Sequence, residues 1–178
     1  MLEYFMPKFI SIFTLPVLLI LSLHAKEPMM AILQNVISNE MQKFTFGNYS
    51  FVCEAYGVVS LEKLYEKSQN NSTCQESIKS FYKKNPYLQY YTESILKNQV
   101  MYHVEFKEKG CVIYVQGKKT LSEVLLEEGL AVSQPSFQDE EYNYSFLKLQ
   151  QRAKSNKKGL WGEDILKSCV DSLYKDAK

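Results

Sequence analysis

The sequence predicts a single α+β domain: strands come first, a helix and two strands follow, and helices end the chain. Three observations support this. The chain has 178 residues, enough for one domain with a sizeable core. Hydrophobic residues make up 46% of it and charged residues 23%, as in ordinary globular proteins. The expected elements do not alternate as strand, helix and strand, and no internal repeat is present.

The first part of the chain is predicted to be extended. Residues 29–37 form an apolar stretch that predicts the first strand. Residues 44–46 and 49–53, rich in aromatic side chains, flank Gly47-Asn48. This is a two-residue hairpin signal, because glycine tolerates a positive φ at the first turn position. Residues 55–59 continue the extended, apolar pattern.

A helix and two strands are expected next. Apolar residues recur at helical spacing within residues 74–84, and Pro86 must interrupt or kink that helix because proline has no amide hydrogen. The helical pattern resumes over residues 87–97. Residues 100–106 then alternate between apolar and polar side chains, the period of a half-buried strand, and residues 111–116 predict a second strand.

Helices are expected to end the chain. Thr120 and Glu123 have the spacing of a capping box and open a short apolar helix that stops at Gly129. A further helix is predicted near residues 145–156, and the tail over residues 164–174 has the spacing of one more amphipathic helix.

Residues 1–25 have the pattern of a signal peptide. Lys8 precedes an apolar and small-residue run over residues 9–23, which is shorter than the ~20 residues of a membrane-spanning helix. We expect cleavage and export, which would place the protein in the periplasm or outside the cell. The alternative is an uncleaved N-terminal anchor, and only then would a membrane be a partner.

The charge balance argues against general nucleic-acid binding. The formal net charge is +1, and Arg152 is the only arginine. Proteins that hold nucleic acid through its phosphates usually carry a basic excess, and a bidentate fork on phosphate is available from this one residue alone. A local basic patch is still compatible with the composition.

All four cysteines lie beyond the signal: Cys53, Cys74, Cys111 and Cys169. An even number of cysteines in an oxidising compartment predicts disulfides. None of the spacings is C-x-x-C and no histidine lies near a cysteine in sequence, so we expect no zinc site and no other resident metal. Four cysteines allow three pairings, and the spacing does not choose among them.

A stretch of about fifty residues resembles a known family. Residues 114–118 read YVQGK, residues 121–131 read LSEVLLEEGLA, and AK and KGLW follow at residues 153–154 and 158–161. In this order they are similar to the second half of the staphylococcal nuclease (thermonuclease) family. The resemblance implies a five-stranded OB-type β-barrel with three flanking helices over residues 29–162. A C-terminal helical extension over residues 163–178 would follow it.

The resemblance also implies a site, and the residues found there differ from it. Nucleases of this family use one calcium ion, carboxylate ligands, a glutamate base and two arginines. Glu40 and Glu62 match two of the carboxylates, and Lys109 is the cation nearest to the position of the second arginine. Glu54 occupies the first arginine position and Val59 a ligand position. We therefore expect standard calcium-dependent cleavage, and with it the cofactor, to be lost.

The resemblance suggests a pairing of the cysteines. Cys53 would lie on the third strand of the barrel and Cys111 on the fifth, and these strands are neighbours in such a barrel. Cys74 and Cys169 would then pin the tail to the first helix. Each closure would stabilise the fold by ~2–4 kcal/mol.

The expected function is that of a binding or scaffolding module whose partner is a protein or an oligonucleotide. Tyr87, Tyr90 and Tyr91 are candidate binding residues, because tyrosine rings stack on bases and pack against proteins, although ordinary core and rim packing is the simpler explanation of the three. The alternative function is a divergent secreted nuclease that uses Glu40, Glu62 and Lys109 with calcium.

Overall fold

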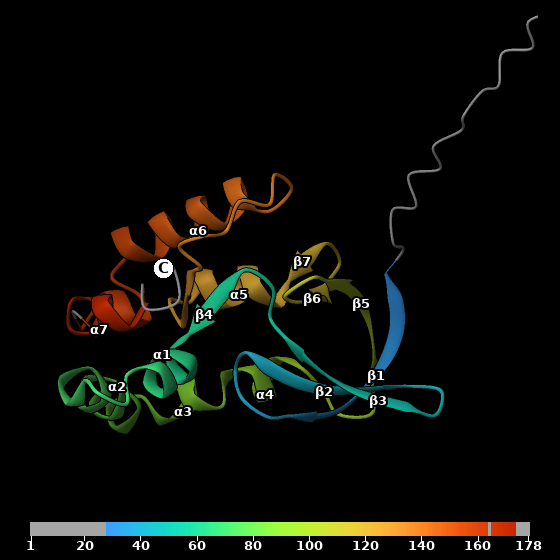
Figure 1. Ribbon diagram of the computed structural model, residues 1–178. Helices are drawn as coiled ribbons and strands as arrows, with labels where there is room; N and C mark the ends of the chain where they lie inside the picture. The colour runs from blue at the N-terminus through green and yellow to red at the C-terminus, as the bar shows by residue number, and fades with distance from the viewer. Residues whose placement is uncertain (1–27, 164, 174–178) are drawn as a thin grey trace, which may run out of the picture.

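The computed structural model describes residues 28–163 and 165–173, so the predicted signal peptide, residues 1–25, lies outside the described part. A six-stranded antiparallel sheet has the order β3-β2-β1-β5-β6-β7, and a second sheet has two strands (Figure 1). The strands of the large sheet are β1 (Met29–Val36), β2 (Met41–Phe46), β3 (Tyr49–Glu54), β5 (Met101–Lys107), β6 (Gly110–Gln116) and β7 (Lys119–Thr120). The small sheet pairs β4 (Val58–Ser60) with β8 (Ala131–Ser133).

The described residues also form seven α-helices and one 3-10 helix. These are α1 (Leu61–Lys67), α2 (Ser72–Lys84), α3 (Pro86–Gln89), α4 (Tyr91–Ile95), α5 (Leu121–Glu127), α6 (Asn143–Ser155), η1 (Gly159–Trp161) and α7 (Ile165–Leu173). The α+β class is confirmed. The expected number of helices, three flanking the barrel and one in the tail, is wrong, because the described residues contain seven α-helices. Asn85 and Pro86 end α2 and start the separate turn α3, and α1 lies in residues for which no element was predicted.

The β2–β3 hairpin forms where its turn chemistry predicted. Gly47 has a φ of 56°, and a Cβ there would meet no neighbour, so backbone conformation alone favours glycine. Phe46 pairs with Tyr49 and Phe44 with Phe51 across the turn. Phe44 is fully buried and its ring stacks on that of Phe51, with centroids 5.9 Å apart. The hairpin thus contributes its aromatic face to the core.

The edge strand β3 and the strand β6 approach each other beyond the end of β3. Ala55 and Cys111 form one parallel bridge, and the backbone amide of Tyr56 donates to the carbonyl of Cys111 at 3.0 Å. The Cys53–Cys111 disulfide joins β3 to β6 beside it. Within the described residues these strands share no longer ladder, so the antiparallel sheet is established while closure into the expected barrel is not.

A second disulfide, Cys74–Cys169, ties α7 to α2, and the two pairs are those that the family resemblance suggested. Both of its cysteines are fully buried. Asn71 adds a polar link: its side-chain oxygen caps α2 at the amide of Cys74, and its side-chain nitrogen donates to the carbonyl of Ser168 at 2.8 Å. As a result α1, α2 and α7 lie together at one end of the molecule (Figure 1).

Candidate functional site

The carboxylate of Glu40 is enclosed where the β1–β2 connection meets the start of α1. Glu40 is 3% exposed, and its Oε2 accepts a 2.6 Å hydrogen bond from the backbone amide of Ser60. Its Oε1 lies 3.8 Å from the Nζ of Lys63, which also lies 2.7 Å from an oxygen of Glu54. One ammonium group therefore lies between two carboxylates.

Local sequence explains how Lys63 reaches this place. Ser60 is the N-cap of α1, and its hydroxyl accepts from the amide of Lys63 at 3.2 Å. The cap fixes the first turn of α1 above the β1–β2 connection. That connection is itself closed by hydrogen bonds from the amides of Ile37 and Ser38 to the carbonyl of Met41.

Glu62 belongs to a neighbouring network. Its Oε1 accepts from the Asn39 side chain at 2.7 Å and from the Tyr82 hydroxyl at 2.8 Å. Its Oε2 is shielded from solvent and has no hydrogen-bond partner. Asn39 also donates to the carbonyl of Leu88 and accepts from the amide of Thr92, so Glu62 is tied to α3 and α4.

Both carboxylic acids are shifted in the same direction. Burial raises the pKa of Glu62 above its ordinary value of 4.5, only partly opposed by its hydrogen bonds to Tyr82 and Asn39. Burial likewise raises the pKa of Glu40, against the hydrogen bond from Ser60 and the charge of Lys63. Burial and the nearby Glu62 raise the pKa of the Tyr82 hydroxyl, which keeps its proton at neutral pH.

A pH dependence of stability follows from Glu62. Because the pKa of Glu62 is higher in the folded than in the unfolded protein, the folded state binds the extra proton. The contribution of Glu62 to stability therefore falls as pH rises from 4.5 through the folded pKa. We expect urea midpoints of the wild type to fall, relative to those of Glu62→Gln, as pH rises above 4.5. The exposed Glu66→Gln is the control, and an equal pH profile for wild type and Glu62→Gln would contradict the assignment.

Lys109 lies apart from these carboxylates. It is exposed in the turn between β5 and β6 and lines a cavity of about 210 Å³ together with Tyr56 and Phe137. It makes no hydrogen bond or ion pair with Glu40 or Glu62. The structure thus brings Glu40 close to the network of Glu62 but leaves the third sequence-derived candidate outside it.

The tyrosine candidates separate into two environments. Tyr87 and Tyr90 are 68% and 57% exposed. Tyr91 is partly buried, and burial together with the charges of Glu128 and Glu127 raises its pKa. None of the ring contacts in the described part joins two of these three tyrosines.

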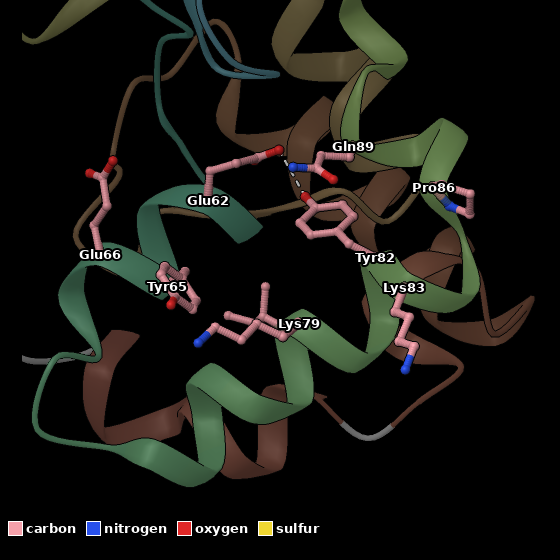
Figure 2. Close-up of a pocket in the computed structure, with 9 residues that line it drawn as sticks. Glu62, Tyr65, Glu66, Lys79, Tyr82, Lys83, Pro86 and Gln89 are labelled. Carbon is pink, nitrogen blue, oxygen red and sulfur yellow. Dashed lines mark hydrogen bonds between the residues drawn. The ribbon is translucent and has the colours of Figure 1, made fainter.

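A pocket of about 510 Å³ lies between α1 and the α2–α3 segment (Figure 2). The carboxylate of Glu62 and the hydroxyl of Tyr82 meet at one of its walls. The lining comprises Glu62, Tyr65 and Glu66 from α1, Ile78, Lys79, Tyr82 and Lys83 from α2, and Pro86 and Gln89 from α3. No pattern in the sequence pointed to this pocket, because it depends on α1, which is short.

The residues present do not fit a calcium ion. Calcium takes six to eight oxygen ligands, several of them carboxylates. Here Lys63 pairs with Glu40, and Val59, which the sequence predicted at a ligand position, is a buried apolar residue. In residues 28–163 and 165–173, no three side chains of His, Cys, Asp or Glu gather as metal ligands. No helix there combines the length and apolar character that a bilayer-spanning segment needs.

Sequence reasoning missed the residues that decide the chemistry of this site. Lys63, Asn39 and Tyr82 were not singled out, although they hold the two glutamates. One signal was available, since Ser60 three residues before Lys63 has the spacing of a helix N-cap. For Asn39 and Tyr82 there was none, because their contacts with Glu62 join segments far apart in the chain.

The fold and the site describe an α+β protein with a buried, internally paired carboxylate network beside a helical pocket. Residues 78–163 match the family described as staphylococcal nuclease homologue, so this segment, which runs from within α2 to just past η1, is an SNase-like domain. It contains Tyr87 and Lys109 but ends before α7 and begins after Glu40, Glu54 and Glu62. A search of curated proteins found no match to the chain.

Proposed function

We propose that this chain is an exported protein whose SNase-like domain binds a ligand or partner and does not cut phosphodiester bonds by the calcium-dependent route. The mature protein would comprise the domain over residues 29–162, closed as an OB-type barrel, and the helical extension over residues 163–178. Two disulfides favour an oxidising compartment, the periplasm or the exterior of the cell. A membrane partner would require residues 1–25 to stay attached.

The observation that carries the proposal is the position of Lys63. Its ammonium group lies 3.8 Å from Glu40 and 2.7 Å from Glu54. A cation bound at Glu40 would meet a repulsion on the order of 4 kcal/mol per unit charge at about 4 Å. The carboxylate of Glu54 would in turn repel a phosphate at the position where the family nucleases use arginine. Both effects oppose the binding of metal and substrate.

One feature favours the second candidate, a divergent nuclease with Glu62 as its base. A carboxyl group whose pKa is raised by burial suits general base catalysis near neutral pH. Glu62 is nevertheless held by Asn39 and Tyr82, and Lys109 lines a different cavity. We therefore favour the binding module, with a protein or an oligonucleotide as partner.

A cleavage assay tests this proposal. The purified protein is incubated with plasmid and single-stranded DNA in calcium, with and without a chelator. We expect no chelator-sensitive degradation. Degradation that the chelator stops and that Glu62→Gln abolishes would overturn the proposal and establish the nuclease, while Glu66→Gln serves as the matched control for a nearby carboxylate outside the network.

A further inference from the structure

The pocket between α1 and α2 has walls of opposite charge. Glu62 and Glu66 are one helical turn apart on α1, and Lys79 and Lys83 are one turn apart on α2, so each pair lies on one face of its helix. Figure 2 shows the carboxylate-bearing helix on one side of the cavity and the lysine-bearing helix on the other. The cavity keeps the two kinds of charge apart.

These charges are not paired with each other. No ion pair in the described part of the chain joins Glu62 or Glu66 to Lys79 or Lys83. The Nζ of Lys79 lies 5.4 Å from the ring centroid of Tyr65. By contrast Lys84, next to Lys83 in sequence, pairs with Glu163 at 2.7 Å. The pocket therefore presents the ammonium groups of Lys79 and Lys83 on one wall and the carboxylate of Glu66 on the other, with no ion pair between them.

Apolar side chains lie between the charged walls. Tyr65, Ile78 and Pro86 line the cavity, and Ile78 is 2% exposed and fixed in the core. The volume of the cavity, about 510 Å³, lies within the range of small-ligand pockets, which combine apolar lining with a few placed polar groups. Glu62 contributes to this wall the hydrogen bond between its carboxyl group and the Tyr82 hydroxyl, and Glu66, which is exposed, contributes the negative charge.

We propose that this pocket binds a small zwitterion with an apolar body, namely a short peptide with free ends. The ammonium end would lie beside Glu66, the carboxylate end beside Lys79 and Lys83, and an apolar side chain against Tyr65 and Pro86. A ligand with a charge of only one sign would form ion pairs with one wall and leave the charges of the other wall unpaired. This inference deepens the proposed binding function and rests on it.

Titration calorimetry of the full chain with the dipeptide leucyl-phenylalanine tests the proposal. We expect saturable binding, weakened at least about tenfold by acetylation of the amino end or amidation of the carboxyl end. Lys79→Gln/Lys83→Gln should weaken binding by a similar factor, whereas Lys43→Gln, an exposed lysine on β2, should not. Glu66→Gln is a second variant that should weaken binding. Because Glu66 is exposed, its replacement should not impair folding.

Equal binding of the free and blocked dipeptides would overturn the zwitterion assignment. Absence of binding up to about 10 mM would overturn the pocket as a peptide site. The same preparation is assayed for chelator-sensitive DNA cleavage, so that the two proposals can fail separately. Cleavage would contradict the proposed binding function. Absence of both cleavage and dipeptide binding would contradict the pocket alone.

Discussion

Replacement of Cys74 and Cys169 together by alanine should lower the free energy of unfolding by about 2–5 kcal/mol. The disulfide joins positions 95 residues apart, and its loss frees nearly the whole domain in the unfolded state. Both cysteines are fully buried, and α7 packs on α1 and α2 through this contact. Urea unfolding of the oxidised wild type and the double variant measures the difference.

The Cys53–Cys111 disulfide provides the comparison. Cys53 and Cys111 are 58 residues apart, so the closure entropy alone predicts an effect about 0.4 kcal/mol smaller for their removal. Near-equal losses in the two double variants are therefore expected. A Cys74/Cys169 variant with an unchanged urea midpoint would show that α7 does not depend on the disulfide for its place.

Glu40→Ala should destabilise the protein by about 3 kcal/mol. The substitution removes a buried carboxylate that accepts the Ser60 amide at 2.6 Å and faces Lys63 at 3.8 Å. The Ser60 amide would be left unpaired, since the N-cap geometry fixes it in a buried position. The loss is measured by urea unfolding at neutral pH.

Glu54→Ala is the matched control for Glu40→Ala. Glu54 binds the same Lys63 at 2.7 Å, but its side chain is 45% exposed, so its removal should cost no more than about 1 kcal/mol. If the two substitutions had equal effects, Glu40 would not be the structural centre of this network, and the account of its neutralisation by Ser60 and Lys63 would fail.

The elements with strong local signals were predictable from the sequence. Gly47-Asn48 located the β2–β3 hairpin, Thr120 and Glu123 form the capping box of α5, and Pro86 stands at the break after α2. Each depends on backbone chemistry within a few residues. The expected strand over residues 55–59 was only partly right, because β4 covers Val58–Ser60 and Ser60 caps α1.

The site itself was not predictable in the same way. The helix α1 has seven residues, too few to be stable alone, so packing of Leu61 and Leu64 into the core fixes it. The pairing of Lys63 with Glu40 requires two residues 23 positions apart in the chain to meet at a definite register. The family resemblance indicated which carboxylates to inspect, but only their contacts show that Lys63, Asn39 and Tyr82 hold them.

The central claim is that the charge of Lys63 occupies the place where a metal ion would bind. Calorimetric titration of the protein with calcium tests this claim most directly. We expect no saturable calcium binding by the wild type at neutral pH, because the ammonium group of Lys63 lies between Glu40 and Glu54. Saturable calcium binding that Glu40→Gln abolishes would contradict it.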